Sequence, residues 1–112
     1  MEVSITDAEG HAHLKPVGRI DSATAMVFEQ TLLAQLTELG RSVLIDLSEV
    51  DYVSSAGLRV FLLGAKKVKG TSVTMVLCAM GDNVRHVFTM SGFDRILLIA
   101  EDVDQGRHML KG

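Results

Sequence analysis

The sequence predicts a single α/β domain in which helices pack against a mixed β-sheet. Two almost continuous apolar runs, at residues 43–47 and 73–78, are typical of strands that are buried on both sides in a parallel sheet. Each is followed by a segment whose apolar residues recur every three or four positions, the spacing of a helix with one buried face. Strand and helix therefore alternate, as in parallel crossovers. With 112 residues the chain suits one core, so we assign residues 1–112 to one domain.

The N-terminal segment predicts a hairpin, which makes the sheet mixed. Residues 1–6 alternate apolar and polar side chains, the sequence AEGH is typical of a turn, and residues 13–20 are expected to return as a second strand that ends near Ile20. Pro16, the only proline, lacks an amide donor. We therefore expect it to lie at an edge position.

The first helix is expected to follow this hairpin directly. Asp21 and Ser22 are good N-cap residues, and Gly40 stands where a C-terminal cap belongs. The predicted buried face of this helix consists of Ala25, Phe28, Leu32, Leu36 and Leu39.

The second helix is expected to begin at Ala56-Gly57-Leu58, after the strand at 43–47, a short acidic turn and two serines. Its predicted core-facing residues are Leu58, Phe61, Leu62 and Ala65, flanked by Val60 and Leu63. Three lysines, Lys66, Lys67 and Lys69, lie near its end, where positive charge suits the helix dipole.

Three further elements complete the predicted order. After the strand at 73–78, Asp82 or Asn83 is expected to cap a third helix, which ends at Gly92. The sequence RILLIA, at residues 95–100, predicts the last strand, and residues 102–110 predict a short terminal helix.

Composition excludes several classes of function. The net charge is -3 and the 11 basic residues are scattered, so no basic stripe offers itself to nucleic acid, and the chain has no Trp and one Tyr for base stacking. Its apolar runs are far shorter than the roughly 20 residues of a membrane span, and the N-terminus lacks a signal-peptide pattern. We expect a soluble, cytoplasmic protein in which the single cysteine, Cys78, is a core residue.

The serine pair Ser54-Ser55 stands at the expected start of the second helix. A serine oxygen there can accept a hydrogen bond from one of the unpaired amides. The spacing leaves open whether Ser54 caps, with Ser55 in the first turn, or Ser55 caps, with Ser54 in the loop. In both cases a serine hydroxyl lies near the positive end of the helix dipole, so the fold would tolerate a phosphate on it. The pair is thus either a cap alone or also a modification site.

Three motifs of this sequence resemble motifs of the STAS domain and follow one another in the same order. STAS is the family of sulfate transporters and anti-sigma factor antagonists. VLIDLSEVDYVSSAGLRVFL is similar to its signature, GRIDSATA to its early loop, and VRHVFTMSGFDRILLIAED to its late helix and strand. The resemblance covers nearly the whole chain. It implies a mixed sheet of four or five strands with helices mainly on one face.

For small free-standing members, the resemblance implies an anti-sigma factor antagonist in partner switching. The unmodified domain would bind an anti-sigma factor that is also a serine-protein kinase, phosphorylation would break this complex, and a serine phosphatase would restore it. The acceptor would be Ser55, with Ser54 as the alternative, and no cofactor or metal is implied. The expected partner-binding residues are Asp21, Ser22, Asp51, Ser54, Ser55, Gly57, Leu58 and Arg59.

Two positions depart from the pattern of phosphorylated members. Ser54 stands where many of them have Asp, which keeps open a capping role for Ser54 or phosphorylation at that residue. Arg59 stands where they often have a second glycine. We expect Arg59 either to pair with Asp51 or with the modified serine, or to extend into solvent.

Three other functions compete with partner switching. The nucleophile-elbow sequence Gly-x-Ser-x-Gly is absent, which argues against an enzyme built on either serine. A response-regulator receiver would need an acidic pair after the first strand and a lysine after the last, and neither is in place, although Asp46 ends an apolar strand. The remaining alternative is a STAS accessory subunit of a membrane ABC transporter, which would bind its ATPase through the same surface without phosphorylation.

Overall fold

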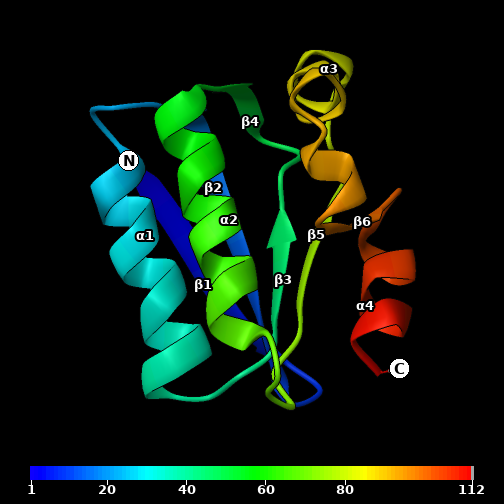
Figure 1. The fold of residues 1–112 in the computed structure, drawn as a ribbon. Coiled ribbons are helices and arrows are strands. Elements are labelled where there is room, and N and C mark those ends of the chain that lie inside the picture. Colours follow the sequence, from blue (N-terminus) through cyan, green and yellow to red (C-terminus); the bar gives the residue numbers. More distant parts are fainter. Residues whose placement is uncertain (112) are drawn as a thin grey trace.

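The computed structural model describes residues 1–111, which form six strands, four α-helices and two shorter helical turns (Figure 1). In chain order the elements are β1 (Glu2–Ala8), β2 (His11–Ile20), α1 (Ala25–Leu33), the π-helical turn η1 (Ala34–Glu38), β3 (Val43–Asp46), β4 (Val50–Val53), α2 (Ser55–Val68), β5 (Met75–Cys78), α3 (Asp82–Ser91), the 3-10 turn η2 (Phe93–Arg95), β6 (Leu98–Ala100) and α4 (Val103–Lys111). The alternation of strand and helix in the second half of the chain is confirmed. Every helix within residues 1–111 is too short or too polar to cross a lipid bilayer.

The sheet is mixed, as expected, but it has one strand more than the largest number predicted. Its strand order is β1-β2-β3-β5-β6, with β4 beside the second half of β2. Only the β1–β2 pair is antiparallel. The additional strand is β4, whose sequence VDYV was interpreted as part of an acidic turn. Its central residues, Asp51 and Tyr52, are exposed, whereas Val50 and Val53 are buried, so it lacks a regular strand pattern.

Pro16 lies inside β2, at a local gap in the pairing of that strand. It faces Val3 of β1. On the other side of β2, pairing with β3 ends at Leu14 and pairing with β4 starts at Gly18. The expected edge position is wrong, because β2 is an inner strand of the sheet. Its proline is tolerated since the missing amide falls in the gap between the pairing with β3 and the pairing with β4.

Two cores lie on opposite faces of the sheet. Figure 1 shows α1 and α2 side by side in front of the strands, with α3 at the end of the molecule where α2 begins. Below these helices Phe28, Phe61 and Phe88 form a row in which successive ring centroids are 5.3 Å apart. The other face carries a smaller cluster, formed by Leu44, Val76, Cys78 and Ala100 and covered by residues of α4. Helices mainly on one face are therefore confirmed, with α4 as the exception.

The first helix departs from prediction at its start and in the last residue of its expected buried face. Its N-cap is Thr24, two residues after Ser22 and three after Asp21. Asp21 instead closes a preceding turn, in which its carboxylate accepts from the Ala23 amide. At the other end the helix widens into η1, and the wider turn changes the direction in which the following side chains point. Leu39 is therefore 62% exposed, although it was expected in the core. Gly40, with φ +60°, ends the element as predicted.

The other helix starts also differ by one or two residues. α2 begins at Ser55 rather than at Ala56. α3 is preceded by Gly81 as its N-cap, so Asp82 is its first residue and neither Asp82 nor Asn83 caps it. Gly92 ends α3 in the left-handed conformation, with φ +78°, as predicted.

Candidate functional site

The start of α2 lies against the end of β2. The Ser54 amide donates to the Ile20 carbonyl oxygen over 2.9 Å. One turn further on, a β-carbon at Gly57 would lie 2.7 Å from that same oxygen and 2.9 Å from a side-chain carbon of Val53. Gly57 is therefore required for this close approach, which fixes the first turn of α2 beside the loop that follows β2.

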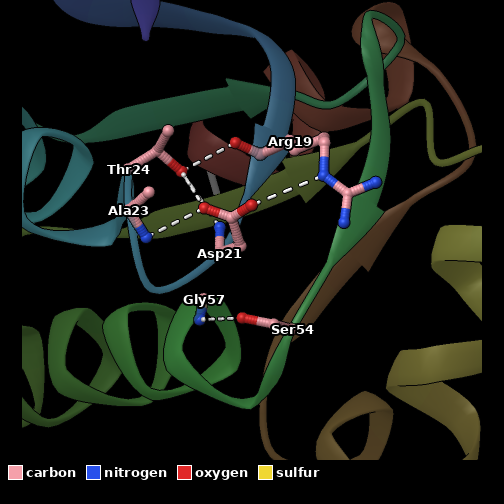
Figure 2. A network of polar contacts seen from close by, with 6 residues as sticks. All are labelled: Arg19, Asp21, Ala23, Thr24, Ser54 and Gly57. Carbon is pink, nitrogen blue, oxygen red and sulfur yellow. Dashed lines mark hydrogen bonds and ion pairs between the residues drawn. The ribbon is translucent and has the colours of Figure 1, made fainter.

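Ser54 is the N-cap of α2, which answers the question that the serine spacing left open. Its backbone is extended, and its Oγ accepts a hydrogen bond from the Gly57 amide over 3.4 Å (Figure 2). Its carbonyl oxygen accepts from the Leu58 amide over 2.9 Å. The Ser54 side chain is half-buried and engaged in the fold.

Ser55 is the first residue of α2 and is exposed. Within residues 1–111 its hydroxyl takes part in no hydrogen bond, in contrast to that of Ser54. The amides of a first helical turn are unpaired donors at the positive end of the dipole. The Ser55 oxygen is thus accessible from solvent and lies in a setting that favours negative charge.

A second group of polar residues surrounds Asp21, in the loop between β2 and α1 (Figure 2). The Asp21 carboxylate accepts from the Ala23 amide over 3.0 Å and pairs with Arg19 Nε at 3.4 Å. The Thr24 hydroxyl donates to the Arg19 carbonyl oxygen over 2.7 Å and accepts from the Asp21 amide over 3.0 Å. The hydrogen bond from Ala23, followed by those from Arg19 and Thr24, outweighs partial burial and lowers the pKa of Asp21 below its ordinary value. Asp21 is therefore held as an anion in one orientation.

Arg19 and Tyr52 extend this surface onto β4, and sequence reasoning missed both. The two residues face each other across the β2–β4 pair, and the Arg19 guanidinium carbon lies 4.2 Å from the centre of the Tyr52 ring. Tyr52 is 40% exposed. The only sequence signal was the single tyrosine in the chain, and its pairing with Arg19 becomes visible only once β4 is recognised.

The structure brings most of the predicted site residues to this one end of the molecule. Ser22 and Arg59 line the same shallow hollow between α1 and α2, about 240 Å³ in volume, which also includes Met26 and Glu29. Leu58 is only 8% exposed, so it anchors α2 in the core instead of offering its side chain to a partner. Of the other predicted residues, Ser22, Asp51, Ser55 and Arg59 are exposed, Asp21 and Ser54 are half-buried, and Gly57 is buried. Their part in partner binding stays a prediction.

Arg59 extends outward from α2. It is exposed, and it forms no ion pair with Asp51 or with any other acidic residue among residues 1–111. Of the two interpretations left open by the sequence, the solvated side chain describes the unmodified protein. A pairing with modified serine stays a prediction.

No histidine nitrogen within residues 1–111 is hydrogen-bonded to Ser54 or Ser55. His13 pairs with Asp46 at 3.1 Å, on the sheet face that α4 covers. Burial raises the pKa of Asp46, but hydrogen bonds from Ser48 and His13 outweigh it, so that this pKa lies below its ordinary value. Asp46 is itself only 6% exposed and is thus a structural residue of the sheet, not an open phosphate acceptor.

The mixed α/β fold and an exposed serine at a helix start are what the three sequence motifs led us to expect. Comparison of the sequence with the profiles of known protein families identifies the family. The profile of the STAS domain matches residues 2–106, and the chain belongs to this family. The resemblance stated from the three sequence motifs is therefore confirmed.

Its relatives are named as anti-sigma factor antagonists. BtrV of Bordetella bronchiseptica, described as a candidate anti-sigma factor antagonist, is 45% identical over 83 residues, which are 74% of this chain and 72% of BtrV. The anti-sigma-F factor antagonist RsfB of Mycobacterium tuberculosis is 30% identical over 93 residues, 83% of this chain and 75% of RsfB. An anti-sigma factor antagonist from Mycobacterium paratuberculosis has the same fold, with a TM-score of 0.90 at 22% identity, over 99% of this chain and 94% of that one.

Proposed function

We propose that this protein is an anti-sigma factor antagonist that works by partner switching. In its unmodified form it binds an anti-sigma factor that is also a serine-protein kinase, and it thereby frees a sigma factor. Phosphorylation of Ser55 by that kinase breaks the complex, and a serine phosphatase restores the binding form. This role places the protein in the cytoplasm, as a binding protein and not as an enzyme. It is supported by the family and by the names of two relatives.

The observation that carries the proposal is the difference between the two serines at the start of α2. Ser54 is half-buried and its oxygen caps the helix, whereas Ser55 is exposed. A kinase can reach the Ser55 oxygen without opening the fold. This makes Ser55 the acceptor we favour and Ser54 the alternative.

Phosphorylation at Ser55 would change the surface while leaving the architecture intact. A phosphate adds roughly two negative charges beside the first-turn amides, where the helix dipole favours them. The oriented carboxylate of Asp21 and the exposed Asp51 already carry negative charge in the unmodified protein. A partner that fits the unmodified surface would meet added bulk and charge, and each 1.4 kcal/mol of repulsion weakens binding about tenfold.

Affinity capture followed by labelling tests this function. Unmodified protein is used as bait, the captured kinase is identified by mass spectrometry, and wild-type, Ser55→Ala and Ser54→Ala proteins are then incubated with it and ATP. We expect one phosphate on wild type, localised to Ser55, and none on Ser55→Ala. Ser54→Ala serves as the matched control and should still be labelled.

The same experiment separates the alternatives. Full labelling of Ser55→Ala would move the acceptor to Ser54 or elsewhere. Capture of a transporter ATPase without kinase activity would instead identify the chain as an accessory subunit of a membrane ABC transporter, which binds through the same surface without phosphorylation.

A further inference from the structure

An apolar groove lies at the end of α2 opposite to Ser55. It has a volume of about 510 Å³ and runs between the C-terminal half of α2, the start of β5 and residues 96–98. Leu62 and Ala65 form its α2 side, and Ile96 and Leu98 form the opposite side. Ile96 is 59% exposed and Leu98 is 48% exposed. The volume lies in the range of small-molecule sites, roughly 300–1,000 Å³.

The charged residues of this groove have one sign. Lys66 and Lys69 line it, and none of its lining residues is acidic. Neither lysine forms an ion pair with any residue from 1 to 111. Lysine stems lie along apolar surface while their ammonium groups stay in water. Two unpaired cations thus stand at the rim of an apolar wall, in a chain whose net charge is negative.

We propose that this groove binds a small anionic amphiphile, such as a medium-chain carboxylate. The apolar chain of the ligand would lie against Leu62, Ala65, Ile96 and Leu98, and its carboxylate would face Lys66 and Lys69. Burial of the apolar chain supplies the affinity, and the two cations select the sign of the head group. The charge complementarity of the rim favours this ligand over a neutral or cationic amphiphile of the same length.

The groove is independent of the partner-binding surface. Ser55 is the first residue of α2, whereas Lys66 and Lys69 lie at its last turn and just beyond it. At a rise of about 1.5 Å per residue this is a separation of roughly 16 to 21 Å, beyond the Debye length of about 8 Å at physiological salt. Phosphorylation at Ser55 should therefore leave binding in the groove unchanged, and both sites can be occupied together.

Titration of the full chain with decanoate below its micelle concentration tests the proposal, with backbone amide NMR shifts as the readout. Decanol and decyltrimethylammonium are the neutral and cationic probes of equal length. We expect saturable decanoate shifts confined to the groove, at Leu62, Ala65 and Ile96, and affinity about tenfold weaker for decanol and weaker still for the cation. Equal affinity for the three probes, or shifts scattered over the surface, would overturn the proposal.

Two sets of variants sharpen the test. The double substitution Lys66→Gln/Lys69→Gln should weaken decanoate binding about tenfold and leave decanol binding unchanged. Lys67→Gln is the matched control, because Lys67 is in the same turn of α2 but does not line the groove. If Lys67→Gln weakens binding as much as the double substitution, the site assignment is wrong.

A second set removes the apolar wall. Ala65→Phe should fill the groove and abolish binding of both decanoate and decanol. If Ala65→Phe fails to fold, Ile96→Asp replaces it, because Ile96 is exposed and that position tolerates a polar residue. Ile96→Asp should likewise abolish binding of both decanoate and decanol. Binding that survives Ile96→Asp in a folded protein would overturn the proposal. Ser55→Glu should bind decanoate like wild type. Loss of decanoate binding and loss of partner binding can therefore be told apart, because the two are measured on separate variants.

Discussion

The two faces of the sheet differ in their chemistry and in the size of the core packed against them. We call the face with the larger core the deeper face and the other one the thinner face. The face below α1, α2 and α3 holds the larger core, with the row of Phe28, Phe61 and Phe88 at its centre. The face below α4 holds a small cluster and a polar pair, His13 with Asp46. The candidate switch surface belongs to the deeper face, because α2 carries Ser55 at its start and Phe61 two turns further on. A helix anchored in this way can change the charge at its end without losing its position.

The largest expected effect is on the deeper face. Phe61 is fully buried and lies between the other two phenylalanine rings, so Phe61→Ala removes contacts on both sides and leaves a cavity. We expect a loss of about 3–5 kcal/mol in the free energy of unfolding, measured by urea denaturation. Met109→Ala on α4, where the side chain is half-buried, should cost clearly less. A loss below about 1 kcal/mol for Phe61→Ala would contradict the comparison of the two faces.

On the thinner face we expect a smaller and pH-dependent effect. Asp46 has a native pKa below its ordinary value of 3.8, so its contribution to stability is present above 3.8 and is lost as the pH falls through the native value. Asp46→Asn should therefore cost about 1–3 kcal/mol at pH 7 and flatten the loss of stability in acid. Melting temperatures of both proteins from pH 7 to pH 2 measure this. Parallel curves would show that the pair with His13 contributes little.

Loss of the helix cap comes next. Ser54→Ala removes the oxygen that accepts from the Gly57 amide, and caps of this kind contribute about 1 kcal/mol. The 3.4 Å length of this bond suggests a value at or below that figure. Chemical denaturation of Ser54→Ala beside Ser55→Ala measures it, and equal stability of the two variants would contradict the assignment of Ser54 as the cap.

The smallest effect on stability is expected at Ser55 itself. Ser55→Glu places one negative charge at the start of α2, so the free energy of unfolding should change by no more than about 0.5 kcal/mol. Affinity for the captured anti-sigma factor should nevertheless fall at least about tenfold, as measured by isothermal titration calorimetry. Ser55→Gln is the uncharged control of similar size. A variant that unfolds would show that the surface and the fold are not separable at this residue.

The fold could be read largely from the sequence because most of its elements have clear periods. The runs at 43–47 and 73–78 are short, apolar and bounded, and they became β3 and β5. β4 was missed since only two of its four residues are buried, and they are not alternate ones. Leu39 was misplaced because helical spacing assumes a constant 3.6-residue turn, and η1 departs from it.

The site could be predicted in part. Asp21, Ser54 and Ser55 could be singled out because caps and family motifs are local in sequence, and their part in partner binding stays a prediction. Arg19, Thr24 and Tyr52 could not be, because their roles depend on β2, β4 and the loop before α1 meeting in space. Which serine caps α2 was likewise undecidable from spacing, since it depends on the backbone angle at which β4 enters the helix.

Tyr52 gives the protein a built-in spectroscopic reporter. The chain has no tryptophan, so this one ring is the source of its near-ultraviolet emission, and it lies under the Arg19 guanidinium on the surface that we assign to the partner. A bound molecule that displaces Arg19 or shields the ring should alter the intensity of that emission. Association and release could then be followed in real time on unlabelled protein, provided that the partner contributes little signal of its own.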